Sequence, residues 1–503
     1  MQDTLIREAP AKGKLLFEDG YDWTSNHDDS FMANLLTTVE DFTRKELKLD
    51  FFENDFMIVP PEDMLDAYTS IAMPHMYHHW AFGQRFLQLK KQYAITNSLA
   101  YELVINSNPC LSVNMQSNST PMMLLVMAHA ACGHNHFFKN NYMFQNWTSP
   151  DGIIGYLKYA ARYIATCEER YGPDRVEGVL DAAHALQGQG VFRSKEERSF
   201  DPKREQQRLK ERAEWEEANA NPNQLLRPAK QKKESKDTLA GLHLPEENIL
   251  YFLEKYAPKL ETWEREILRI VRMIAQYFYP QGQTKVMNEG CATFVHKYVI
   301  DRFGDMGLIG PGTVFEMLKS HAGVTYQQMF RETGRLSNSF NPYHLGWKMC
   351  EDIRRICENP TDEDRRWFKY WAGEKDWTAV LRDAWANYRD DSFIQQFLSP
   401  QLMRDLRMFT LRDGDGELVV DNIHREYDSY EKVRDALSKA HNYDTLHPDI
   451  QIMACDMEGD RTLVLHHTQH NGVDLHKADE AMTMGYLRKL WGYNVVMTNG
   501  WPV

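Results

Sequence analysis

The sequence predicts a mainly α-helical protein that ends in a smaller α+β part. Long stretches carry apolar residues at three- and four-residue spacing, notably 245–256, 260–278 and 285–303. Near the C-terminus, short extended runs alternate with helical ones, which is typical of an α+β fold. The chain has 503 residues, of which 43% are hydrophobic, so it can bury a large core and is too long for one ordinary domain.

The first hundred residues contain helical and irregular segments. An amphipathic helical pattern covers residues 41–48, and the acidic, apolar run 50–61 is interpreted as irregular. Residues 60–97 predict one or two helices rich in aromatic side chains. Asparagines and a proline interrupt the apolar run that follows, so residues 103–111 are expected to form a strand or turn, and 111–115 to be extended.

A helix is then expected to begin at Thr120-Pro121, because proline fits the first turn of a helix. Residues 153–171 continue the helical pattern. From residue 192 to about 244 the chain becomes rich in charged and amide side chains without an apolar period. Such a segment has little apolar surface to offset its ordering entropy, and it predicts a solvated connector. The alternative is a docking arm for a partner.

Beyond the connector, helices are expected at 245–256, 260–278 and 285–303, where apolar residues recur at helical spacing. Further helices are expected near 314–321, 346–357 and 377–397. The turn sequence Asp413-Gly414-Asp415-Gly416 predicts a hairpin. The remaining C-terminal elements are a helix at 430–439, strands at 450–457 and 462–467, a helix at 475–491 and a final strand at 494–498. This order resembles a ferredoxin-like arrangement.

Four segments follow from this pattern. Residues 1–191 form an N-terminal helical part that carries a histidine cluster, and 192–244 form the charged connector. Residues 245–400 form a second helical part that is expected to share one core with the first, and 401–503 form the C-terminal α+β domain.

Charge and cysteine usage exclude several classes of protein. A net charge of −14 argues against a protein that coats nucleic acid, because phosphate neutralisation requires a basic face. No stretch reaches the roughly 18 apolar residues of a membrane span, and the N-terminus lacks the apolar region of a signal peptide, so we expect a cytoplasmic protein. Seven irregularly spaced cysteines predict reduced thiols. No P-loop, dinucleotide-binding glycine motif or serine-hydrolase elbow is present.

The first cluster of chemically capable side chains contains His129, His134 and His136, directly after an apolar helix. Imidazole is a common ligand for zinc and iron. His129 and His134 are five residues apart, about 140° around an α-helix, so they converge only if the helix bulges or ends near Gly133. His129 and His136 nearly eclipse each other. The spacing leaves both pairs open, and no glutamate follows His129 as it does in H-E-x-x-H metalloproteases.

The second cluster lies on the helix expected at 285–303. Lys285, Glu289 and His296 share one face of it, and small Gly290 and Ala292 would allow another backbone to approach. Buried charges of this kind are costly unless they satisfy one another or a metal. The cluster therefore predicts either a metal site or a structural ion-pair network.

Other histidines and cysteines carry weaker signals. His78 and His79 cannot both face inward on one helix, so at least one of them is expected to face solvent or to have a packing role. Cys132 and Cys291 fall inside the two main clusters without a ligand-spacing signature, and buried structural thiols are the simpler interpretation.

Long motifs in this chain resemble the SpoVR (stage V sporulation protein R) family. The matching residues are Met73-Pro74 with Tyr77, His79-Trp80 and Phe82-Gly83; Glu102 to Pro109; His129 with Gly133-His134 and Phe137 to Asn141; Lys285 to Gly290 with Ala292 and His296; and Asn341-Pro342-Tyr343 with Gly346.

The resemblance implies a bacterial, cytoplasmic protein linked to spore formation or to stationary-phase stress. It also implies a PrkA-like serine protein kinase as partner. The family's site pattern falls on His129, His134, Glu289 and His296. The chain departs from that pattern at Cys291 and His136, so these two residues are poorer candidates for the family's site, although His136 stays a candidate beside His79 and Lys285.

A second resemblance is to zincin-type metallopeptidases, which share the order of extended strand, histidine helix and distant Glu-Gly-x-Ala helix. It implies a zincin-like core in which His129, His134 and Glu289 hold the metal. Because the H-E pair is absent, either the general base comes from elsewhere, with Glu102 and His296 as the candidates, or the site no longer hydrolyses a substrate.

Two functional hypotheses follow. The first is a metal-dependent hydrolase of amide or peptide bonds, acting on a peptidoglycan-related or protein substrate, with zinc as the expected metal and iron or manganese as alternatives. The second is a non-catalytic regulatory or scaffold protein that works with the kinase. An oxidative iron enzyme is a third, more distant alternative.

Overall fold

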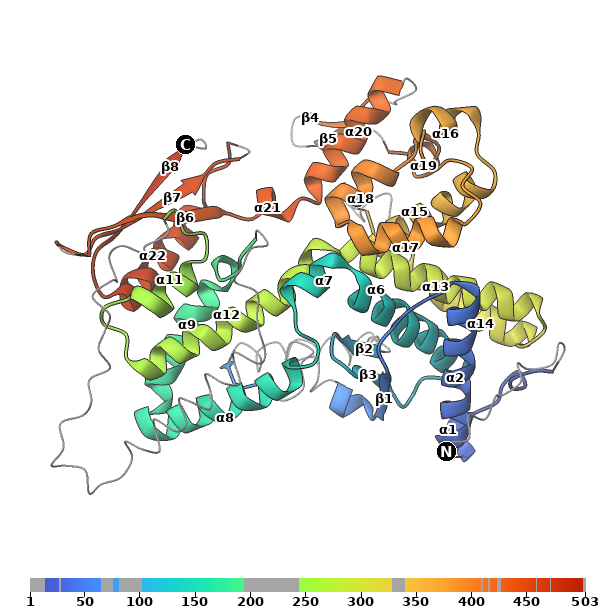
Figure 1. The fold of residues 1–503 in the computed structure, drawn as a ribbon, viewed down its shortest axis with the longest axis horizontal. Helices are drawn as coiled ribbons and strands as arrows, with labels where there is room; N and C mark the ends of the chain where they lie inside the picture. The colour runs from blue at the N-terminus through green and yellow to red at the C-terminus, as the bar shows by residue number, and fades with distance from the viewer. Residues whose placement is uncertain are drawn as a thin grey trace. The chain divides into compact units, whose positions relative to one another are not determined.

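The computed structural model describes residues 14–26, 29–64, 76–80, 102–193, 244–327, 340–408, 410–414, 417–422, 427–457, 459–470 and 472–500. Helices predominate among them (Figure 1). The chain divides into two compact units, the first from Met1–Pro74, Trp80–Gln145 and Gln281–Asn442, and the second from His75–His79, Asn146–Pro280 and Tyr443–Val503. Each unit therefore combines segments that are distant in sequence.

The first unit is a helical assembly with two small sheets. Its helices are α1 (Trp23–Asn26), α2 (Asp29–Glu46), α5 (Thr120–Val126), η1 (Met127–His134), α6 (Asn135–Asn140), α13 (Lys285–Asp305), α14 (Pro311–Val324), α15 (Pro342–Glu358), α16 (Asp362–Trp367), α17 (Trp377–Asn387), α18 (Asp390–Phe397), α19 (Pro400–Asp405) and α20 (Tyr427–Ala440). Its strands are β1 (Asn54–Val59), β2 (Glu102–Ile105), β3 (Cys110–Met115), β4 (Thr410–Gly414) and β5 (Glu417–Asn422).

Helix α13 lies at the centre of this unit. It is buried along most of its length because apolar side chains occur on all sides of it, including Val286, Phe294 and Val299. Helices α14 and α15, together with η1, pack against it. One continuous hydrophobic core surrounds these helices. A polar side chain on α13 therefore requires a specific partner.

The sheet of the first unit has the strand order β1-β3-β2. β1 runs parallel to β3, with Asn54 opposite Cys110, and β2 runs antiparallel to β3, with Glu102 opposite Asn114. The extended segments expected at 103–111 and 111–115 are thus found. The expectation of irregular chain at 50–61 is wrong for β1, because its partner β3 lies far along the sequence and the local pattern does not reveal a parallel pairing.

The second unit contains α8 (Ile153–Tyr171), α9 (Pro173–Ala185), η2 (Gln187–Gln189), α11 (Ile249–Tyr256), α12 (Thr262–Gln283), α21 (Tyr443–Leu446), α22 (Lys477–Trp491) and the strands β6 (Asp449–Cys455), β7 (Leu463–Thr468) and β8 (Val495–Gly500). α7 (Tyr142–Trp147) and α12 each carry residues of both units.

The C-terminal sheet differs from the expected ferredoxin-like arrangement. Its order is β6-β7-β8, with β6 antiparallel and β8 parallel to β7, and α22 connects the two parallel strands. The predicted hairpin forms a separate two-stranded sheet, β4 with β5, in the first unit. The ferredoxin-like topology is therefore wrong for the described residues, because the hairpin and α20 join the helical core instead of the C-terminal sheet.

The helices expected from the apolar periods are found, some of them extended by a few residues, and Pro121 lies in the first turn of α5 as predicted. The two compact units do not follow the segment boundaries expected at residues 191, 244 and 400. For example, the C-terminal helix α22 packs on α9, which precedes the connector, and both belong to the second unit. The connector and most of the aromatic run 60–97 lie outside the described residues. None of the described helices is long and apolar enough to cross a membrane.

Candidate metal centre

The two histidines of the first cluster converge because their helix changes its hydrogen-bond pattern. Residues 127–134 form a π-helix, and the N–H of Asn135 that closes it donates to Ala130 O, five residues earlier. In a π-helix, residues five apart lie nearly above one another, whereas in an α-helix they diverge. His129 and His134 consequently share one face, and their rings stand 4.7 Å apart between centroids. The bulge required by the spacing is present.

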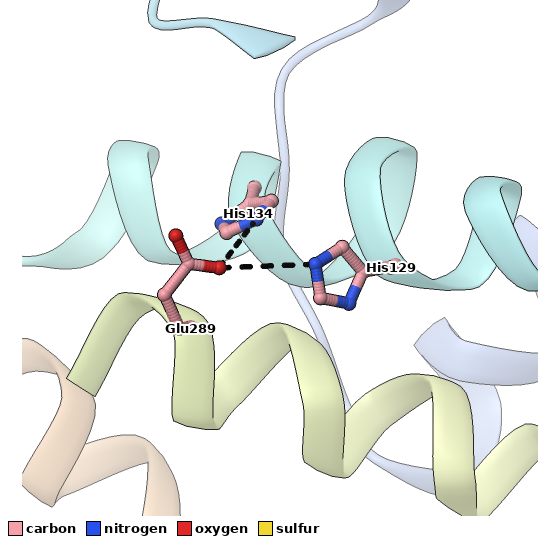
Figure 2. Close-up of side chains that lie close together, drawn as sticks. All are labelled: His129, His134 and Glu289. Carbon is pink, nitrogen blue, oxygen red and sulfur yellow. Dashed lines mark ion pairs between the residues drawn. The ribbon is translucent and has the colours of Figure 1, made fainter. Parts of the chain in front are cut away.

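Glu289 completes the group from the facing helix α13 (Figure 2). Its Oε2 lies 3.4 Å from His134 Nε2 and 3.9 Å from His129 Nε2. One ligand atom from each of the three residues lies within 4.8 Å of the other two. The structure thus brings together the three residues that the sequence predicts as ligands, although about 150 residues separate the two segments.

Small residues allow the two helices to approach this closely. A Cβ atom on Gly133 would lie 2.5 Å from Ala292 Cα, so η1 and α13 touch backbone to backbone there. On the other side of α13, a Cβ atom on Gly290 would lie 2.5 Å from Gly346 Cα in α15. The small side chains around Glu289 are therefore explained by helix packing.

The N-terminus of α13 is also held in place. The backbone N–H groups of Val286 and Met287 donate to the Asp390 carboxylate at 2.8 and 2.9 Å. These bonds satisfy backbone donors in the first turn of the helix, which otherwise lack partners. They anchor the turn that precedes Glu289.

The carboxylate of Glu289 and the ring nitrogens of His129 and His134 are arranged so that they could bind a metal cation. Glu289 Oε2 is buried and accepts no hydrogen bond, although two imidazole nitrogens face it. In the part of the chain that the structure describes, no lysine or arginine forms an ion pair with Glu289. A buried carboxylate oxygen without a donor is costly, and a metal ion between it and the two imidazoles would satisfy all three. The donor set of two nitrogens and one oxygen is that of a zinc-type site.

In the metal-free group, the protonation equilibria favour charge on both His134 and Glu289. Burial opposes the protonation of His134, but Glu289, Asn288 and Glu102 together raise its pKa. Burial likewise opposes the ionisation of Glu289, but His134, His129 and Tyr343 together lower its pKa. Burial, followed by the neighbouring His134 and His296, holds the pKa of His129 well below its usual value. The group therefore favours a carboxylate beside positive charge, which a metal would also supply.

A second carboxyl group borders the cluster. Glu102 is the first residue of β2, and its Oε1 lies 3.7 Å from His129 Nε2. Burial raises the pKa of Glu102 to about 7; His134 opposes this rise and Glu289 adds to it. A carboxyl group whose pKa lies near neutrality is suited to exchanging protons.

Two neighbouring side chains orient the cluster. Asn288 Oδ1 lies 2.8 Å from His134 Nδ1 and accepts a hydrogen bond from its N–H, which leaves the lone pair of Nε2 toward Glu289. Tyr343 hydrogen-bonds to the Glu289 carboxylate, and its ring stacks on His129 with centroids 6.2 Å apart. Such outer partners fix ligand geometry in metal sites.

Comparisons with known proteins identify the family of this chain. A family model described as SpoVR like protein matches residues 27–446, and a SpoVR-like C-terminal domain matches residues 448–500. The chain belongs to the SpoVR family. It is 42% identical over 486 residues to the uncharacterized protein YcgB of Escherichia coli (strain K12), covering 95% of this chain and 93% of that protein. No solved structure matches it, so a zincin-like core stays a prediction.

The other candidates of this SpoVR chain lie elsewhere. His136 is buried, but its Nδ1 lies 2.8 Å from Asp50 O and its ring packs on Trp385, so it does not join the cluster. His79 belongs to the second unit, where its Nε2 lies 3.0 Å from Asp181 Oδ1 and its ring stacks on His184.

Lys285 is not buried as the sequence predicts. It was predicted to share a buried face with Glu289, yet it is exposed and is the first residue of α13. Its neighbours Thr284 and Val286 are buried, so the core covers this turn of the chain but not the Lys285 side chain. An internal pair between Lys285 and Glu289 is therefore absent.

His296 contacts the candidate ligand His129 and not the Glu289 carboxylate. Its Nδ1 lies 2.9 Å from His129 Nδ1, and its Nε2 lies 2.8 Å from His321 Nδ1. Burial first, and then the neighbouring His321 and Lys297, hold the pKa of His296 well below its usual value. Burial, followed by Lys297 and Lys348, lowers the pKa of His321 to about 4. The three imidazoles are therefore neutral neighbours.

Sequence reasoning missed three residues of this site as functional candidates, Asn288, His321 and Tyr343. Asn288 adjoins Glu289, and an amide beside a ligand is a signal that could have found it. Tyr343 lay in a family motif without an assigned role. His321 lies alone on α14, and only the tertiary contacts reveal its connection to the site.

Replacing Asn288 by leucine is expected to weaken metal binding about 10- to 100-fold, because His134 loses the acceptor that orients it. Competition with a chromophoric chelator measures this affinity. Asn288→Asp keeps an acceptor at the same place and should retain binding. Equal affinities for the leucine variant and the parent protein would exclude the orienting role.

Proposed function

We propose that this SpoVR protein is a metal-dependent hydrolase of amide or peptide bonds. The observation that carries the proposal is the buried Glu289 Oε2, which faces two imidazole nitrogens and accepts no hydrogen bond. Two histidines and a glutamate are the protein ligands of several hydrolytic zinc sites, which leave a further position for water or substrate.

Glu102 is the proposed general base. It lies beside His129 Nε2 but outside the three-residue cluster, so its carboxylate can take a proton without giving up a ligand role. When bound, the metal supplies Lewis acidity toward a carbonyl group and a water molecule. Glu102 would accept the proton of the attacking water and pass it to the leaving amine, while Tyr343 holds the Glu289 carboxylate in place.

The accessible side of the centre is the carboxylate side. The side chains of Glu102 and Glu289 are 20% and 17% exposed, whereas that of His129 is 5% exposed. β2 lies at the end of the strand order among the described strands, so an extended peptide could add beside it and bring a carbonyl group to Glu102. These features favour an extended, peptide-containing substrate, either a protein segment or a peptidoglycan stem peptide.

The test combines metal analysis with a substrate screen. The purified protein is analysed for zinc, iron and manganese, and then incubated with a peptide library and with muropeptides whose products are read by mass spectrometry. Glu102→Gln should keep the metal and lose about 10²- to 10⁴-fold in turnover. Glu53→Gln, at an exposed glutamate just before β1, is the control and should leave turnover unchanged.

The outcomes separate the hypotheses. Stoichiometric metal with Glu102-dependent cleavage supports the hydrolase. A folded, metal-free protein without cleavage would favour the regulatory role beside a kinase. Metal-dependent cleavage that persists in Glu102→Gln would support the hydrolase activity and exclude Glu102 as its general base.

A further inference from the structure

A row of three imidazoles leads away from the candidate metal centre. It begins at His129 on η1, passes through His296 on α13 and ends at His321 on α14. All three side chains are buried, at 4%, 1% and 5% exposure. The two contacts between them, 2.9 and 2.8 Å between ring nitrogens, have the length of hydrogen bonds.

Each neutral imidazole carries one N–H, so a row in which both contacts are hydrogen bonds allows two proton orders. In the first, His129 Nδ1–H donates to His296 Nδ1, and His296 Nε2–H donates to His321 Nδ1. In the second, both hydrogen bonds run the other way. Only the first order leaves the lone pair of His129 Nε2 directed toward Glu289, where a metal would bind.

We propose that His296 and His321 are positioning residues of the metal centre: their hydrogen bonds hold His129 in the metal-binding tautomer, and metal binding at His129 sets the tautomer of His321. The inference rests on the metal centre of the proposed function and not on hydrolysis. No imidazole changes its charge in this scheme. In passing from the second order to the first, the two protons inside the row each move to the neighbouring ring, His129 Nε2 releases one proton to solvent, and His321 Nε2 takes one up from solvent.

The far end of the row makes this coupling observable. In the metal-binding order the third proton lies on His321 Nε2, which is buried without a hydrogen-bond partner. The ring of Trp347 stands perpendicular to His321 at 4.5 Å between centroids, an arrangement in which an N–H can contact a π face. A proton on Nε2 or on Nδ1 of His321 gives different nitrogen signals, so the tautomer reports the state of the centre.

The first experiment uses the full-length protein labelled with ¹⁵N-histidine, titrated with Zn²⁺. The His321 signals are identified by their absence from His321→Gln. We expect zinc to place the His321 proton on Nε2, and His296→Phe, which removes the middle link, to abolish the response of His321 to zinc. A zinc-loaded protein with the proton on His321 Nδ1 would overturn the proposal.

The second experiment measures affinity for Zn²⁺ by chelator competition. His321→Leu removes the acceptor for His296 Nε2–H and should weaken binding about tenfold, the lower end of what the loss of an outer-shell partner costs. His321→Gln restores an acceptor and should restore affinity. His344→Leu is the control, because His344 also packs against Trp347 but bonds to Thr325 O, outside the row.

These results are interpreted against the melting temperature of the metal-free variants. Weaker binding in His321→Leu alone, with metal-free melting like that of His344→Leu, supports the positioning role. Unchanged affinity, or an equal loss in the control, would overturn it. If the parent protein binds no zinc, both the proposed metal centre and this inference are wrong. If it binds zinc and His321 changes its tautomer, but no substrate is cleaved, only the proposed hydrolase activity is wrong.

Discussion

Glu289→Gln is expected to lose at least about 100-fold in metal affinity, because a direct ligand costs more than an outer-shell partner. The metal-free protein should fold normally. Glutamine keeps the size of the side chain and can still accept the Tyr343 hydrogen bond, and it removes a buried charge that is costly without a metal. The rise in melting temperature that metal gives the parent protein should vanish in the variant.

The measurement is metal content together with thermal melting, with and without chelator. Glu351→Gln is the control, since Glu351 pairs with Lys348 on α15 and lies outside the cluster. A variant that melts lower by the same amount with and without chelator, and that still holds metal, would show a structural role. In a buried ion pair, loss of one partner costs about 3 to 5 kcal/mol whether or not metal is present.

Gly346→Ala is expected to reduce the free energy of unfolding by about 3 kcal/mol, near the upper end for overpacking. A Cβ atom at this position would lie 2.0 Å from Val286 O and 2.7 Å from Gly290 Cα, so it meets backbone on the central helix α13. Backbone cannot rotate away as a side chain can. α13 would have to move, and Glu289, next to Gly290, would move with it, so metal affinity should fall as well.

Urea unfolding measures the loss in stability, and chelator competition measures the loss in affinity. Gly323→Ala is the matched control on α14, where an added Cβ meets no atom within 4 Å. Alanine is favoured over glycine inside a helix, so this control should gain about 0.5 to 1 kcal/mol. Equal stability of the two alanine variants would contradict the close packing of α13 and α15.

Much of the candidate site was predictable from local patterns. The apolar residues all around 285–303 indicated a buried helix, and a buried glutamate on it required a partner. The histidines after an apolar helix supplied the most suitable partner type. Residue chemistry and burial together predicted a metal site or an ion-pair network in these two segments, and the family resemblances implied His129, His134 and Glu289 as the ligands.

Tertiary packing decided what the spacing left open. The choice of His134 over His136 depends on the π-helix, which is intrinsically less favourable than an α-helix and is supported here by the contact of Gly133 with Ala292. The sequence around His129 cannot show which distant residue will pack there. The burial expected for Lys285 is wrong for a related reason, since helical spacing does not show which side of a helix its distant neighbours will cover.

The sequence by itself determined the helical class, the pairing of the two strands that became β4 and β5, the alternation of strands and helices near the C-terminus and the two clusters of candidate ligands. The structure alone decided the parallel pairing of β1 with β3, the separation of β4 and β5 from the C-terminal sheet and the row that ends at His321. The physical reason is the distance along the sequence between the residues that interact. Periodicity and turn chemistry act over a few residues, whereas these features depend on contacts between segments that fold together from distant parts of the chain.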